Sequence, residues 1–212
     1  MLQTVIRPPR AAEDIATGVR LARMHGKEIS PAAVARTLRL AKVRYVLVGA
    51  HAANGYTGRP RTTVDVDVVV QFPKKAAKAI AREFPRLQMH DTPVVIRFME
   101  GNTEAIDLMK PAGSQLWARL LKETRDIRLE GERVRIPLLE GVLAAKFAAM
   151  ASPYRRPADK QQDGADFMRI IDANAEVDLD LLRELGDLVY GGGGAFVLKL
   201  LADARAGRRL EF

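Results

Sequence analysis

The sequence contains no cysteine, which excludes disulfide bonds and zinc sites built on thiolates. It also lacks any apolar run long enough to span a membrane, and residues 1–9 do not have the layout of a signal peptide. We therefore expect no membrane partner and, by default, a cytoplasmic location. Histidine is scarce as well. The three histidines are scattered and form no metal site, although His51 could contact a substrate.

Aromatic residues make up only 6% of the chain, which counts against a platform for stacking single-stranded RNA. By contrast, 34 lysines and arginines against 26 acidic residues give a net charge of +8. The excess lies in the first three quarters of the chain, because residues 151–212 contain eleven acidic and nine basic side chains. Such a charge favours a polyanionic partner, either a nucleotide or RNA, but it is equally typical of a soluble basic surface.

Hydrophobic residues form 48% of the chain, enough for a core, and their pattern changes along the sequence. We predict an α/β protein in three parts: an N-terminal helical segment at 1–40, an α/β core at 41–137 and a helical region at 138–212. In the first part a helix is expected over 11–24. A second helix should begin at Ser30, an N-cap that is followed by a first-turn proline.

The pattern of the core alternates strands and helices and contains two hairpin signals. A Gly-Asn pair and a Glu-Gly pair each separate two apolar runs, so each pair of strands should be antiparallel. The run of four glycines near the C-terminus is interpreted as a flexible hinge, since no Lys-Ser or Lys-Thr follows it as in a phosphate-binding loop. From residue 44 onward the expected elements are strands at 44–48, 63–70, 94–99, 104–109, 125–129 and 132–136, and helices at 51–56, 73–84, 138–150, 158–172, 179–189 and 195–206.

Two aspartates, Asp65 and Asp67, interrupt one of these apolar runs. Because side chains two residues apart on a strand point to the same face, the two carboxylates could hold cations between them. Charges placed within an apolar run need a compensating partner, and a divalent metal ion is the simplest one. The alternative is a solvated strand face, which the surrounding valines disfavour.

A small-residue turn, Gly49-Ala50, precedes these aspartates, and a third carboxylate, Asp107, stands on a later predicted strand. This order resembles the signature of the nucleotidyltransferase superfamily. Within it, residues 48–67 resemble the abortive-infection toxin type, whose members share a Gly-rich turn and an Arg-x-Thr before the carboxylates. The resemblance covers roughly residues 40–172. One departure is Ala50, because the family has glycine or serine at that position.

The resemblance implies a small mixed-sheet nucleotidyltransferase core with N-terminal helices and a helical C-terminal part. It also implies an enzyme that moves a nucleoside monophosphate from a nucleoside triphosphate, such as ATP, to a hydroxyl acceptor. Two Mg²⁺ or Mn²⁺ ions would stabilise the attacking and leaving oxygens. Asp65, Asp67 and Asp107 would be the catalytic metal ligands, and Asp107 could instead accept the proton of the hydroxyl.

Further residues are expected to bind the substrate. Gly49 lets the backbone approach a phosphate closely, and Ala50 keeps the N–H group of a helix start. Arg61 and Thr62 directly precede the carboxylates. The resemblance implies that Arg61 pairs with the acidic cluster or the triphosphate, while the alternative is an exposed loop arginine.

Lys146 and the run 155–166 resemble the lysine and the Lys/Asp helix that face the site in this family. On this basis we expect Lys146 and Lys160 to bind substrate. The spacing of lysine and aspartate residues within the run fits a salt-bridged surface helix equally well, so both interpretations stay open.

Three functions fit the sequence. The first is transfer to RNA, such as a tRNA end, or to a protein hydroxyl, as in toxin-type relatives, with an antitoxin protein as a further partner. The basic helix at 73–84 could then bind RNA, although such a stripe is often only a solvated face. The second is modification of a small molecule such as an antibiotic, which an acidic pocket would favour. The third is a non-catalytic binding module, against which the three aspartates argue.

Overall fold

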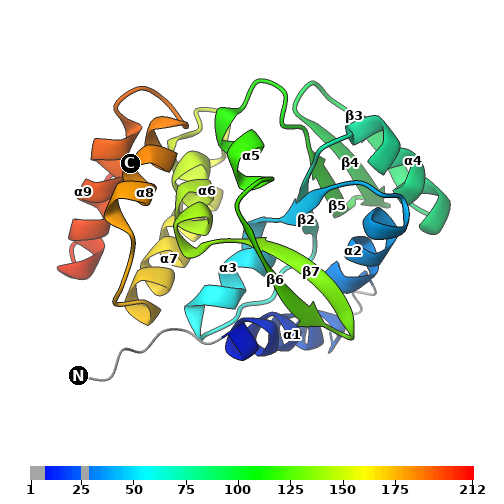
Figure 1. The fold of residues 1–212 in the computed structure, drawn as a ribbon, viewed down its shortest axis with the longest axis horizontal. Helices are drawn as coiled ribbons and strands as arrows, with labels where there is room; N and C mark the ends of the chain where they lie inside the picture. Colours follow the sequence, from blue (N-terminus) through cyan, green and yellow to red (C-terminus); the bar gives the residue numbers. More distant parts are fainter. Residues whose placement is uncertain (1–7, 25–28) are drawn as a thin grey trace.

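The computed structural model describes residues 8–24 and 29–212, so residues 1–7 and 25–28 of the predicted N-terminal segment lie outside it. At its centre is a mixed five-stranded sheet (Figure 1) with the order β1-β2-β5-β4-β3. β2 and β5 are parallel, and the other neighbours are antiparallel, which confirms the predicted mixed α/β class. The strands are β1 (Tyr45–Leu47), β2 (Val66–Val70), β3 (Gln88–Asp91), β4 (Val95–Glu100) and β5 (Thr103–Met109).

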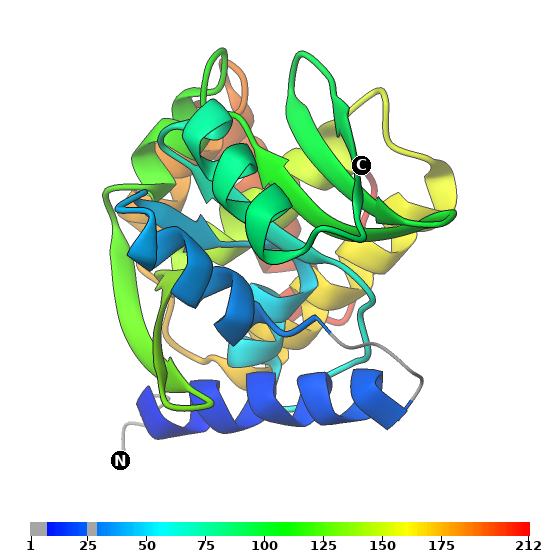
Figure 2. The same cartoon turned by 90° about the vertical axis from the view of Figure 1, so that its right-hand side faces the viewer.

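The N-terminal helices pack on the core. α2 (Pro31–Leu40) begins as predicted, because the Ser30 side chain accepts a hydrogen bond from the backbone N–H three residues later. α2 lies beside α4 (Pro73–Glu83), while α1 (Pro8–Met24) packs against α3 (Gly49–Thr57) (Figure 2). In the part of the chain that the structure describes, no helix combines the length and apolar character of a membrane span.

Both predicted hairpins are present. β4 and β5 pair around Gly101 and Asn102, and β6 (Thr124–Leu129) pairs with β7 (Glu132–Pro137) in a separate two-stranded sheet. Two elements were not predicted. The four residues of β3 are all exposed and lack apolar alternation, and α5 (Gln115–Leu120) is too short for its period to show in the sequence.

The strand that carries the aspartates is shorter than predicted. β2 begins at Val66, so Asp65 lies just before the strand and only Asp67 lies within it. The expectation that one strand holds both carboxylates is therefore wrong for Asp65. The Thr63 hydroxyl donates a hydrogen bond of 2.7 Å to the Asp65 carboxylate, a local side-chain contact that competes with strand pairing at this point.

Four C-terminal helices follow, as predicted, and gather at one end of the molecule (Figure 1). One cluster of buried side chains joins the three predicted parts, since it includes Ile15, Val68 and Phe167. The division into 1–40, 41–137 and 138–212 thus describes the order of the elements rather than separate cores. The C-terminal helices are α6 (Leu139–Ala151), α7 (Pro157–Ala173), α8 (Leu179–Asp187) and α9 (Gly193–Arg205).

Two of the four glycines belong to a helix contact rather than to the flexible hinge that we expected, while Gly191 and Gly192 form the turn before α9. Gly193 and Gly194 begin α9 and let it pack closely against α8. A Cβ atom on Gly193 would lie 2.4 Å from the carbonyl oxygen of Gly186, and one on Gly194 would lie 2.4 Å from that of Arg183. Since both obstacles are backbone atoms, the glycines are required by a rigid contact between two helices.

We expect Gly193→Ala to lower the free energy of unfolding by about 1–3 kcal/mol, because the added methyl group forces α8 and α9 apart. Gly191→Ala is the matched control, since its Cβ would meet no atom within 4 Å. It should change stability by no more than about 0.5 kcal/mol. Urea unfolding followed by circular dichroism measures both. Equal losses in the two variants would restore the hinge interpretation.

Candidate active site

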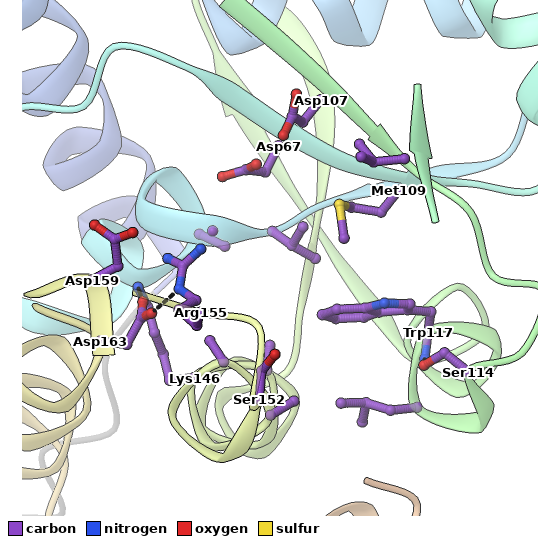
Figure 3. A pocket seen from close by; sticks show the side chains of 18 of the residues that line it. Asp67, Asp107, Met109, Ser114, Trp117, Lys146, Ser152, Arg155, Asp159 and Asp163 are labelled. Carbon is purple, nitrogen blue, oxygen red and sulfur yellow. Dashed lines mark hydrogen bonds and ion pairs between the residues drawn. The ribbon is translucent and has the colours of Figure 1, made fainter. Parts of the chain in front are cut away.

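A cavity of about 1290 Å³ lies between the sheet, the loop before β2 and the C-terminal helices (Figure 3). Most of the predicted site residues line it. Lys160 is not among the lining residues, so the structure does not bring this predicted substrate-binding lysine to the cavity. The predicted residues that do line it are Gly49, Ala50, Arg61, Thr62, Asp65, Asp67, Asp107 and Lys146.

The three carboxylates come together through the sheet. Asp67 of β2 lies directly opposite Asp107 of β5 in the parallel register, so the two side chains share one face. Figure 3 shows both of them beside the cavity. Asp65 reaches the same cavity from the residue before β2, where its hydrogen bond from Thr63 orients the carboxylate.

Gly49 is needed because the Asp67 carboxylate lies against it. Its φ angle of 64° is in the left-handed region, and a Cβ atom there would come within 1.9 Å of Asp67 Oδ2. The carboxylate therefore rests on the backbone where α3 begins. The first N–H groups of a helix have no partner within it and form the positive end of its dipole. Ala50, which is buried, keeps this backbone donor.

The Asp67 carboxylate has no directly contacting basic group in the described residues, although the charges of Lys146 and Arg155 act on it from a distance. Burial raises its pKa well above the ordinary value, and the charges of Asp65 and Asp107 raise it further. No hydrogen bond or ion pair of this carboxylate is found within residues 8–24 and 29–212. Asp67 is only partly buried, so its carboxylate oxygens are open to the cavity, and the oxygens of Asp65 and Asp67 are of the kind that suits Mg²⁺.

Metal binding here would depend on the substrate. In the described residues no three Asp, Glu or His side chains are arranged as a ready-made metal site. Mg²⁺ is usually held by one or two carboxylates together with substrate phosphates and water, so two aspartates are sufficient protein ligands. The donor set therefore fits such an ion in the presence of a nucleotide.

Asp107 is already paired, unlike Asp67. Arg97 of β4 donates from Nε to Oδ1 at 2.9 Å and from Nη2 to Oδ2 at 2.6 Å, and its Nη1 contacts Glu104. These contacts raise the pKa of the Arg97 guanidinium, chiefly through the hydrogen bond to Asp107. Sequence reasoning missed Arg97, because nothing in the local pattern shows which residue of β4 lies opposite Asp107.

A buried ion-pair network forms a second wall of the cavity. Lys146 of α6 is only 5% exposed, and its ammonium group contacts Asp163 at 2.9 Å and Asp166 at 2.7 Å. Arg155 also contacts Asp163, at 2.7 Å. Asp163 and Asp166 of α7 thus face inward to Lys146, as expected for a lysine at the site. The alternative of a surface helix with a Lys160–Asp163 pair is not observed in the described residues, because Asp163 is buried and pairs with Lys146 and Arg155.

Arg61 belongs to the same network. It donates to both oxygens of Asp166, at 3.0 Å from Nε and 3.0 Å from Nη2, so its acidic partner is on α7 and not among the three carboxylates at the sheet. Burial alone would raise the pKa of Asp166, but the hydrogen bonds and charges of Arg61 and Lys146 lower it below the ordinary value. Asn54 of α3 holds the Arg61 backbone through two hydrogen bonds, of 2.9 and 3.0 Å.

The opposite end of the cavity is largely apolar. Trp117 of α5 lies away from Asp67 and Asp107 in Figure 3, and Met109 of β5, two residues after Asp107, lies between them and Trp117 in this view. Ser114 fixes the start of α5 by accepting a hydrogen bond from the backbone N–H of Trp117. Trp117 was not among the predicted site residues, because α5 was not predicted from the sequence.

His51 does not contact the cavity, contrary to our expectation. It is 3% exposed within α3, and its Nδ1 atom has no hydrogen-bond partner among the residues that the structure describes. Burial lowers its pKa to about 4, although the charge of Asp65 opposes the shift. His90, by contrast, is exposed on β3.

Comparison with solved structures shows the fold that this cavity belongs to. No family model matches the sequence, and a search of curated proteins finds no match. An antigenic nucleotidyltransferase-like protein from Paracoccidioides brasiliensis is 16% identical, with a TM-score of 0.52 over 93% of this chain and 94% of that one. A candidate nucleotidyltransferase from H. pylori is 19% identical, with a TM-score of 0.51 over 92% and 93%.

A third similar structure is that of the antibiotic-resistance factor ANT(2'')-Ia. It is 12% identical, with a TM-score of 0.51 over 92% of this chain and 98% of that one. At such low identities the similarities show the fold alone, and they confirm the expected nucleotidyltransferase-like architecture.

His51 should make the protein less stable in mild acid. The unfolded histidine takes up a proton near pH 6.5 and the folded one only near pH 4, so stability is lost as the pH falls between these values. The full loss is about 3 kcal/mol. We expect His51→Leu to remove this dependence in urea unfolding between pH 7 and 4, and His90→Gln to keep it. A wild-type pH dependence in His51→Leu would show that protonation of His51 does not cause the loss of stability.

Proposed function

We propose that this protein is a metal-dependent nucleotidyltransferase, which moves a nucleoside monophosphate from a nucleoside triphosphate to a hydroxyl acceptor. The observation that carries the proposal is the Asp67 carboxylate. It lies unpaired against Gly49 at the start of a helix, in a cavity that it shares with Asp65 and Asp107. The fold shared with solved nucleotidyltransferase-like proteins supports the same conclusion.

The divalent cation would bind at two of the three aspartates. Asp65 and Asp67 would hold Mg²⁺ or Mn²⁺, which would neutralise charge on the phosphate oxygens during transfer. Asp107 completes the carboxylate cluster through its place opposite Asp67. Thr63 and Gly49 position the two ligands, one by a hydrogen bond and the other by leaving room for the carboxylate.

The triphosphate would lie between the start of α3 and the ion-pair network. The backbone N–H groups of Gly49 and Ala50 suit a phosphate, as at other helix starts. In the network, Arg61, Lys146 and Arg155 outnumber the two aspartates of α7, so this wall is positively charged. Arg155 is the most accessible of the three, with its side chain 44% exposed, and could donate to a phosphate oxygen.

The size of the cavity leaves room for an acceptor. Pockets that bind drug-sized ligands measure roughly 300–1,000 Å³, and this cavity of about 1290 Å³ is larger. The polar end suits the triphosphate, while the apolar end near Trp117 suits a base or another ring. Part of the acceptor could enter beside the nucleotide.

RNA, such as a tRNA end, is the acceptor that the surface charge favours. Lys74, Lys75 and Lys78 are all exposed on α4, and the net charge of the chain is +8. A toxin-type activity, with a protein acceptor or an antitoxin partner, rests on the sequence resemblance over residues 48–67. The second candidate is a small hydroxyl compound, because a walled cavity of this size can enclose one and ANT(2'')-Ia is an antibiotic-resistance factor.

The acceptor can be identified by label transfer. Purified protein is incubated with Mg²⁺, each α-labelled nucleoside triphosphate, total RNA and cell extract. Label in RNA would support RNA as the acceptor. Label in a small compound or in protein would identify that molecule as the acceptor instead. No transfer with any triphosphate, Mg²⁺ or Mn²⁺ would argue for a non-catalytic module.

We expect Asp67→Asn to lower kcat by about 100-fold or more, because the site acts mainly through charge. Thermal stability should hold or rise, since the substitution removes a partly buried carboxylate that Asp65 and Asp107 repel. Asp172→Asn, at an exposed aspartate of α7, is the matched control and should change neither quantity. Wild-type turnover in Asp67→Asn would remove the catalytic assignment.

RNA binding should weaken as the salt concentration rises, and the lysines of α4 should contribute to this salt dependence. The logarithm of the affinity should fall linearly with the logarithm of the salt concentration, with a slope of about −0.7 per contacted phosphate. Reversing the charges of Lys74, Lys75 and Lys78 should reduce the slope by up to about 2, while triphosphate affinity stays unchanged. Fluorescence anisotropy measures both the salt dependence of RNA binding and the triphosphate affinity. Absence of RNA binding at low salt, with activity on a small hydroxyl compound, would favour the second candidate.

A further inference from the structure

We infer that Arg97 takes the place of one of the two metal ions expected for nucleotidyl transfer, so that the site binds a single divalent cation through Asp65 and Asp67. This inference rests on the proposed function. It concerns how the positive charge of the site is divided between the chain and the ion.

The contrast between the two facing aspartates is the first argument. Both oxygens of Asp107 accept hydrogen bonds from the Arg97 guanidinium, at 2.9 Å from Nε and 2.6 Å from Nη2. Such two-point pairs are among the strongest that a carboxylate makes in proteins. A cation that approached Asp107 would have to displace Arg97 or lie beside its positive charge. Asp67, directly opposite, has no such partner in the described residues.

The backbone of the hairpin aims Arg97 at Asp107. With the regular register that begins at Glu100 and Thr103, Arg97 would lie opposite Ile106. An extra residue in β5, Ala105, forms a bulge that shifts the pairing, so that Arg97 lies opposite Asp107. Bulges are often found next to active sites, where they redirect a side chain.

The same bulge supplies a second anchor for the arginine. Glu104 and Asp107 are three residues apart, so in a regular strand they would face opposite sides of the sheet. Here both line the cavity, and Arg97 contacts both of them. The guanidinium is therefore held by two carboxylates. A side chain fixed in this way provides a permanent positive charge beside Asp67, and Arg97 acts as a positioning residue for Asp107.

The test counts bound ions directly. Mn²⁺ is titrated into the protein in the presence of a non-hydrolysable triphosphate analogue, and free Mn²⁺ is measured by electron paramagnetic resonance. We expect one Mn²⁺ per wild-type chain and two per Arg97→Gln chain, because the substitution releases Asp107. Arg36→Gln is the matched control, since this exposed arginine pairs with Glu83 away from the cavity, and it should bind one.

Two further variants keep the test decisive if Arg97→Gln does not fold. Asp107→Asn should change the Mn²⁺ affinity by less than about 2-fold, whereas Asp67→Asn should weaken it by at least about 10-fold. Near-ultraviolet circular dichroism confirms that each variant is folded.

The outcomes distinguish failure of the role of Arg97 from failure of the proposed function. Two ions per wild-type chain, or one ion in both wild type and Arg97→Gln, would overturn the role of Arg97 and leave the proposed function standing. Loss of Mn²⁺ affinity in Asp107→Asn equal to that in Asp67→Asn would do the same. A wild-type protein that binds no Mn²⁺ with the analogue would overturn the proposed function itself.

Discussion

The parallel pairing of β2 with β5 is the constraint on which the site depends. It sets Asp67 opposite Asp107, with Asp65 just before the strand, and so concentrates like charges at one face of the sheet. The chain relieves this repulsion unequally. Arg97 neutralises Asp107, while Asp67 rests against Gly49 with its pKa raised.

The positive wall of the cavity follows from a second set of buried charges. Lys146 joins α6 to α7 through Asp163 and Asp166, and Arg61 extends the connection to the loop before β2. Because that loop leads directly into the strand of Asp67, the network also ties the positively charged wall of the cavity to the strand that carries this carboxylate. Burial of a lysine with two aspartates is costly unless each charge is paired, and here every one of them is.

The features that sequence reasoning predicted were those encoded by neighbouring residues. The Gly49-Ala50 turn, the two hairpins and the cap at Ser30 each depend on a short local pattern, and the Asp-x-Asp pair stands out against its valines. The features it missed depend on contacts between distant residues. Arg97 meets Asp107 only because of a bulge at Ala105, which no turn residue signals. Gly193 looked like part of a linker, because the backbone it touches belongs to another helix.

The network around Lys146 also bears on how this protein can change during evolution. Loss of the lysine would leave Asp163 and Asp166 with only the more exposed arginines Arg155, Arg61 and Arg169 as counter-charges, and loss of either aspartate would leave the buried ammonium group with one partner instead of two. A single substitution at Lys146, Asp163 or Asp166 should therefore destabilise the protein. These residues should be inherited together or replaced together by an apolar set, and intermediate combinations should be rare among descendants of this chain.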